Sequence, residues 1–217
     1  MKYKSLLLLT ALATASSQAA VTVTDNGLTA PTLGVNDTGY IGAPNARFGW
    51  GDGVNETVGQ TFTLASPITL GSIWISYNDF DAGTVTLTLT VDAGNNGSNE
   101  ITETGVVLDN SNFSGSSDDG GASPYYWMQF DLSSHNLVLP SGVSKFSIVA
   151  TAATSGGSDS WPLGSMYNNT DVYAGGSEQG LPNGGDFLFA VTEVPEPSSS
   201  LLLALGTGAL AWRRRRC

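Results

Sequence analysis

The chain has 217 residues, of which 8 are basic and 19 acidic, so its formal net charge is −11. A surface with this excess of negative charge repels nucleic-acid phosphates and anionic lipid headgroups, which disfavours binding of either by the folded part. One histidine and one cysteine are too few for a typical zinc site or for an intramolecular disulfide.

Residues 1–19 have the three parts of a secretory signal peptide. Lys2 and Lys4 precede an apolar core at residues 6–13, and Ser17 and Ala19 supply the small residues that signal peptidase needs at the cleavage site. We therefore predict a signal helix that is removed by secretory signal peptidase after Ala19.

Residues 20–193 carry the predicted folded body. Of the basic residues they keep only Arg47 and Lys145, against 18 acidic residues, so the body has a net charge of −16. About 175 residues are enough for one domain with a hydrophobic core.

Short strands separated by turns rich in glycine and asparagine recur along this body. The clearest is 84–91, where Val85, Leu87, Leu89 and Val91 alternate with four threonines. Residues 21–55 and 154–179 are the least regular and are expected to form long loops and edge strands. The other predicted strands are 57–64, 68–77, 101–108, 125–132, 143–151 and 186–192.

No window of the body has a convincing helical period. Repeated short strands with glycine-rich turns predict an all-β fold, an antiparallel β-sandwich that is jelly-roll-like. The predicted signal helix precedes it and a short apolar C-terminal helix follows it.

Residues 194–217 combine a proline-containing turn, an uncharged apolar run at 201–212 and a basic end. Pro195 and Pro197 favour an extended, accessible tether. With residues 198–200 added, the apolar run spans roughly three quarters of a 30 Å hydrocarbon core, which is short for a permanent membrane helix. A basic cluster that acts as a cytoplasmic-side stop follows it, formed by Arg213, Arg214, Arg215 and Arg216.

The order of Pro195, Glu196 and Pro197, the apolar run and the arginine cluster resembles the PEP-CTERM sorting signal of Gram-negative bacteria. The resemblance implies export, transient anchoring in the inner membrane, and cleavage near Pro195 to Pro197 by an exosortase. It also implies delivery to the cell surface or to the extracellular polysaccharide matrix. An ordinary C-terminal membrane anchor is the alternative for this tail.

The chain departs from the family by ending on Cys217 rather than on a basic residue. This cysteine is either discarded with the tail or is lipidated or cross-linked. The body also resembles the β-sandwich ectodomains that commonly accompany the signal, at residues 59–64, 68–75 and 185–191.

The residues give little support for catalysis. His135 is expected to be a turn or surface histidine, because the body has no cysteine nucleophile and no Gly-x-Ser-x-Gly elbow to partner it. A carboxylate pair for glycoside hydrolysis is not excluded by composition, since sequence does not give distances. Glu100 and Glu103 are expected to be solvated. We predict no catalytic residues and no required cofactor.

Two kinds of ligand site are candidates. Oxygen-rich loops suit a structural calcium ion, for which the candidate residues are Asp79, Asp81, Asp118 and Asp119, with exposed turn acids as the alternative. Loop-borne aromatic rings suit stacking on sugars, for which the candidates are Trp50, Trp161, Tyr167 and Tyr173, with rings that cap the sandwich as the alternative. Trp74, Trp127 and Phe130 are interpreted as core or sheet-face residues.

These observations predict a secreted, non-enzymatic surface or extracellular-matrix protein with a structural or adhesive role. The first alternative is a carbohydrate-binding domain held on exopolysaccharide, and the second is a glycoside hydrolase. The expected partners are signal peptidase, an exosortase and a polysaccharide, with no nucleic acid.

Overall fold

The computed structural model describes residues 20–42, 46–50, 57–80, 83–114, 126–155, 163–168, 170–176, 178–179 and 185–195. The alternating segment at 84–91 becomes β6 (Gly83–Asp92). Its apolar residues Val85, Leu87, Leu89 and Val91 are fully buried, and the threonines between them are half-buried. One face of this strand therefore belongs to the core and the other to the surface, as a period of two requires.

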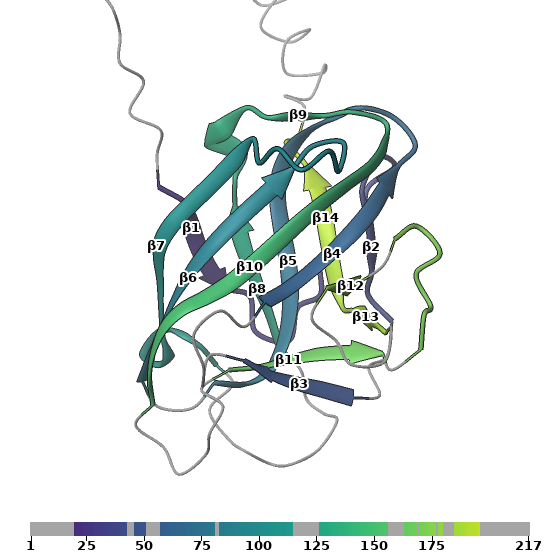
Figure 1. The fold of residues 1–217 in the computed structure, drawn as a ribbon. Helices are drawn as coiled ribbons and strands as arrows, with labels where there is room; N and C mark the ends of the chain where they lie inside the picture. The colour runs from purple at the N-terminus through teal and green to yellow at the C-terminus, as the bar shows by residue number, and fades with distance from the viewer. Residues whose placement is uncertain are drawn as a thin grey trace, which may run out of the picture.

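The described strands pair into two antiparallel sheets that lie face to face (Figure 1). In sheet A the main order is β1 (Thr22–Asp25), β8 (Tyr126–Asp131), β5 (Ile68–Phe80), β14 (Phe189–Glu193) and β2 (Thr38–Tyr40). In sheet B the order is β12 (Glu178–Gln179), β4 (Thr57–Leu64), β10 (Gly142–Ser155), β6 and β7 (Ile101–Asp109).

Shorter elements complete the described part. Near the start of β5 lies β9 (Val138–Leu139), and near its end lies β11 (Leu163–Asn168), which also pairs with β3 (Ala46–Trp50) and β13 (Asp186–Phe187). Two single-turn 3₁₀ helices follow β7 and β8, η1 (Asn110–Asn112) and η2 (Ser133–His135).

The core fills the space between the two sheets. The ring centroid of Phe146 lies 6.3 Å from that of Phe62, which is also in sheet B. It lies 5.7 Å from the ring centroid of Phe189, which is in sheet A. All three rings are fully buried. The contact between Phe146 and Phe189 joins the inner faces of the two sheets, so the prediction of an antiparallel β-sandwich is confirmed.

The predicted strands agree closely with those observed. The segment predicted as one strand at 186–192 is divided into β13 and β14, because Leu188 leaves the ladder between them. The irregular segment 21–55 supplies β1 and β2 at the ends of the sheet A order, together with β3.

Gly71 changes which face of β5 is buried. Before it, Ile68 and Leu70 enter the core; after it, Ile73 does. The pairing with β14 shifts at this point, where Glu193 is opposite Leu70 and Thr192 opposite Ser72. A Cβ on Gly71 would lie 2.6 Å from the Glu193 carbonyl oxygen, so only glycine fits this irregularity without displacing the backbone.

The predicted signal helix at 1–19 and the predicted apolar helix at 201–212 lie outside the described residues. Within the described ranges, no helix has the length and apolar composition needed to span a bilayer.

Candidate functional site

A groove of about 380 Å³ lies on the outer face of sheet A. Three neighbouring strands build it: β5 contributes Trp74, β8 contributes Gln129 and β14 contributes Thr192. In the strand register Trp74 is opposite Gln129, so their side chains are neighbours on one face. Trp74 points outward because the irregularity at Gly71 reverses the alternation of β5.

Hydrogen bonds fix the polar edge of the Trp74 ring. Its indole N–H donates to the Ser72 hydroxyl at 2.8 Å, and that hydroxyl is 2.7 Å from the hydroxyl of Thr192. Ser72 is only 3% exposed, whereas Trp74 is half-buried. The ring is thus held in place while part of its apolar surface stays accessible in the groove.

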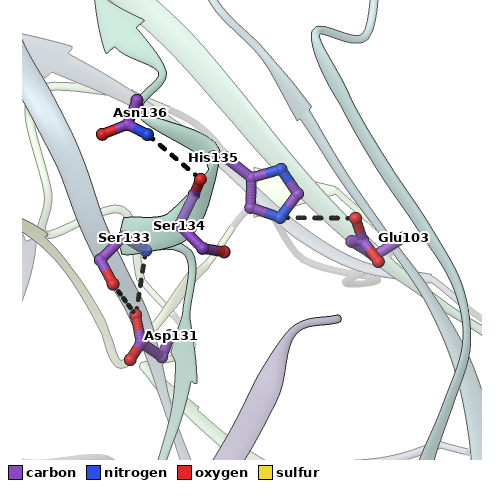
Figure 2. Close-up of polar contacts among 6 residues, drawn as sticks. All are labelled: Glu103, Asp131, Ser133, Ser134, His135 and Asn136. Atoms are coloured by element: carbon purple, nitrogen blue, oxygen red, sulfur yellow. Dashed lines mark hydrogen bonds and ion pairs between the residues drawn. The ribbon is translucent and has the colours of Figure 1, made fainter. Parts of the chain in front are cut away.

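Three carboxylates line the groove. Asp131, at the end of β8, accepts hydrogen bonds through Oδ1 from the Ser133 N–H at 2.9 Å and the Ser133 hydroxyl at 2.6 Å (Figure 2). Within the described part of the chain, neither Asp131 Oδ2 nor the Gln129 amide has a protein hydrogen-bond partner. Both groups remain available to a ligand.

Asp37 and Glu193 form the rim beside the chain's C-terminal exit. Asp37 accepts from the Glu193 N–H at 2.8 Å and from the Gly34 N–H at 2.7 Å. The Glu193 carboxylate accepts from the Asn36 amide at 3.2 and 3.3 Å. The rim acids are therefore ordered by backbone and amide donors, and no lysine or arginine lies among the described residues that line the groove.

The same region holds the start of the tail. The Val194 N–H donates to the Thr69 carbonyl at 2.9 Å, which extends the pairing of β14 by one residue. Pro195 is exposed and lines the groove. The tail thus leaves the sandwich next to the groove.

Of the aromatic residues predicted from sequence as sugar platforms, only Tyr173 has a described side chain, and Tyr173 is not among the described residues that line this groove. Trp50 lies in β3 and Tyr167 in β11, at opposite ends of the pairing between those strands, and their side chains are not among those described. Trp161 lies outside the described residues. Tyr173 packs edge-on against Phe189 at 5.1 Å, and its hydroxyl is 2.6 Å from that of Thr38.

Trp74 was missed as a site residue because a tryptophan in a strand is ordinarily buried. The available signal was the pair of serines at positions 72 and 76. In a regular strand these serines lie on the same face as Trp74, and polar neighbours indicate a face that is turned to solvent. That signal is weak, because Ser76 is itself fully buried.

The predicted calcium ligands are not tested by the structure. The backbone of Asp79 lies in β5, opposite Gly164, and its side chain is not described. Asp81, Asp118 and Asp119 lie outside the described residues. Among the side chains that are described, no group of three or more acids, histidines or cysteines is close enough to hold a metal ion. The calcium site stays a prediction.

His135 occupies η2, as the turn interpretation expected, but its side chain is 1% exposed and not at the surface. Its Nε2 is 3.4 Å from Glu103 Oε1 on β7, so the pair joins the two sheets at one edge (Figure 2). Glu103 therefore lies beside a buried imidazole, whereas Glu100 is exposed and its carboxylate accepts from the Ala93 N–H at 2.6 Å. Ser133, in the same turn, donates its hydroxyl proton to Asp131. These contacts do not form a serine, histidine and carboxylate chain of the kind used in nucleophilic catalysis.

The residues of the sorting and processing signals lie outside the described part of the chain, apart from Pro195. These are Ala19, Glu196, Pro197, Arg213, Arg214, Arg215 and Arg216.

Comparison with known proteins gives one match. Residues 193–216 match the family described as the PEP-CTERM protein-sorting motif, which begins at the last residue of β14. No curated protein and no solved structure matches the chain. The chain therefore carries a PEP-CTERM sorting motif, which indicates an exported protein that is recognised and processed at the membrane by an exosortase.

Proposed function

We propose that this protein is a non-enzymatic surface or extracellular-matrix protein with an adhesive role, and that it attaches to polysaccharide through the groove around Trp74. The sorting motif supplies the route to the outside, and the groove supplies the contact there. The groove is the observation that carries the proposal.

The body is proposed to be a jelly roll. Successive strands alternate between the sheets from β4 to β5 to β6, then from β7 to β8 to β10, which supports two interleaved Greek keys. Such an arrangement leaves the outer faces of both sheets open, because no helix covers either face among the described residues. An open face suits a long polymer that has to lie across it.

The groove has the composition of a sugar site. Its volume of about 380 Å³ is at the small end of the range for ligand sites, enough for one or two sugar rings. Trp74 offers apolar surface for the C–H face of a sugar, and Gln129 and Asp131 offer open hydrogen-bonding groups beside it. Specificity in such pockets comes from a few placed polar groups around an aromatic surface.

The neighbouring acids support a binding role rather than hydrolysis. Asp37 and Glu193 each accept hydrogen bonds that order the loop at residues 34–37 against β14. A retaining or inverting glycosidase needs one carboxyl group kept protonated as the general acid. Asp37 and Glu193 instead hold this loop in place, which is a structural role.

The test is polysaccharide co-sedimentation with the full-length chain solubilised in mild detergent. The wild type is expected to bind at least one immobilised polysaccharide, and Trp74→Ala to bind about tenfold more weakly. Val143→Ala, which changes an exposed residue on sheet B, is the matched control. Circular dichroism checks that each variant is folded. Equal binding by the wild type and the folded Trp74→Ala variant would overturn the proposal, as would absence of binding to every polymer.

A further inference from the structure

The charges and hydrogen-bonding groups of the groove identify a class of glycan, if the groove binds polysaccharide as proposed above. We infer that its ligand is a polysaccharide whose sugars carry free, protonated amino groups. Three features of the groove support this inference: its charge, its balance of donors and acceptors, and the position of Trp74 relative to Asp131.

The charge of the groove excludes acidic polymers. Asp37, Asp131 and Glu193 all line it, and the predicted body around it has a net charge of −16. A uronic acid seated on Trp74 would bring a fourth carboxylate into this space without a cation to offset it. The negative charges of a uronic acid and of the three groove acids repel one another. A protonated amine is instead attracted by each of the three acids.

The groove is also rich in acceptors and poor in donors. Carboxylates accept hydrogen bonds only. Several of the donors nearby are already used: the Trp74 N–H donates to Ser72, and the Ser133 N–H and hydroxyl donate to Asp131. The Gln129 amide is a remaining donor in the groove, and it can meet a ring hydroxyl of the sugar. A neutral sugar hydroxyl both donates and accepts, but an ammonium group donates three hydrogen bonds and accepts none. An ammonium group therefore matches this wall better than a hydroxyl does.

The strand register places the aromatic ring and the open carboxylate at a suitable separation. Ser72 is opposite Asp131 and Trp74 is opposite Gln129, so Trp74 and Asp131 are diagonal neighbours on one face. Diagonal neighbours in an antiparallel pair are about 7–8 Å apart, which is close to the width of a sugar ring with its substituents. A sugar stacked on Trp74 can thus direct an amino group toward Asp131 Oδ2, and the indole face adds a cation–π attraction.

The experiment uses the full-length chain in mild detergent and four immobilised probes. These are a β-1,4-linked glucosamine polymer with free amines, its fully N-acetylated counterpart, a neutral glucan and a polyuronate. We expect the free-amine polymer to bind about tenfold more tightly than the acetylated polymer, and the polyuronate to bind most weakly. The preference for the free-amine polymer should decrease as salt is raised, because charge attraction is screened.

Two isosteric variants separate the groove from the overall negative charge. Asp131→Asn removes one groove charge, and its expected effect is about threefold weaker binding of the free-amine polymer with unchanged binding of the acetylated one. Glu100→Gln removes one charge from the turn between β6 and β7 on sheet B and should change neither. Equal losses for both variants would mean non-specific attraction to the acidic body and would overturn the inference.

Other outcomes separate the inference from the proposed function. If the acetylated or neutral polymer binds as tightly as the free-amine polymer and Trp74→Ala still weakens binding, the groove binds glycans but the inferred class is wrong. If no polymer binds, both fail. Spermidine tests whether a small amine is sufficient: displacement of the polymer by spermidine at equal amine concentration would overturn the requirement for sugar rings.

Discussion

Asp25 provides a test of how the edge of sheet A is held. Its carboxylate accepts from the Gly27 N–H at 2.9 Å, the Tyr77 hydroxyl at 2.8 Å, the Ser114 N–H at 2.8 Å and the Ser114 hydroxyl. Ser114 lies just after η1, which follows β7 of sheet B, so these bonds join the edges of the two sheets. Asp25→Asn would replace one carboxylate oxygen, which accepts hydrogen bonds, with an amide N–H₂ group, which can only donate them.

The expected cost follows from the number of donors affected. If the amide nitrogen faces Ser114, two donors lose their acceptor, and bonds to a charged group contribute about 1.5–3 kcal/mol each when buried. Asp25 is only half-buried, so solvent compensates part of this loss. We expect the free energy of unfolding at pH 7 to fall by about 2 kcal/mol.

The dependence on pH gives a sharper check. Burial by itself would raise the pKa of Asp25, but hydrogen bonds from the Ser114 hydroxyl, the Gly27 N–H, the Tyr77 hydroxyl and the Ser114 N–H together lower it below the ordinary value of 3.8. A carboxyl whose pKa is lower in the folded than in the unfolded state stabilises the fold fully above the unfolded pKa. That contribution is lost as pH falls through the folded pKa.

The measurement is urea denaturation of the wild type and Asp25→Asn between pH 7 and pH 2. The difference in unfolding free energy should stay constant down to about pH 5 and narrow below about pH 4. The control is Asp109→Asn, since Asp109 also has a lowered pKa through Ser111 but is exposed and caps only the local turn. A difference for Asp25→Asn that stays constant to pH 2, or one matched by Asp109→Asn, would refute the reasoning.

Two further substitutions test the core and the tail exit. Gly71→Ala would bring a Cβ to 2.6 Å from the Glu193 carbonyl oxygen, so we expect a loss of about 1–3 kcal/mol in urea denaturation together with weaker polysaccharide binding. Unchanged stability would contradict the close approach of β5 and β14. Phe189→Ala removes a fully buried ring at the contact between the sheets, and thermal and urea denaturation should show a loss of about 3–5 kcal/mol. Val138→Ala, at a residue 59% exposed, is its control and should stay within about 0.5 kcal/mol of the wild type.

Local patterns predicted the strands well where one face is wet and the other buried. Residues 84–91 show this best, because the threonines and the aliphatic residues alternate without interruption. The division of 186–192 was missed because Phe187, Leu188 and Phe189 are all buried, so no alternation marks the break between β13 and β14. Strand β11 lies within a segment expected to be irregular and has no such alternation in LGSMYN.

The candidate site was harder to predict than the strands. Aromatic residues in loops were the reasonable candidates for sugar stacking, yet the accessible tryptophan of the described groove lies in a central strand. Likewise, His135 and Glu103 are far apart in the sequence, and nothing in either local segment indicates that they meet.

The sequence by itself determined the all-β class and the sorting motif at the C-terminal end, because period-two alternation and the order of proline, apolar and arginine segments are local properties of the chain. Only the tertiary structure decided that Trp74 faces outward beside Gln129 and Asp131. That outcome depends on the irregularity at Gly71 and on how β5 pairs with β8 and β14. Such pairing joins residues far apart in sequence, so it is fixed by the packing of the two sheets and not by any single strand.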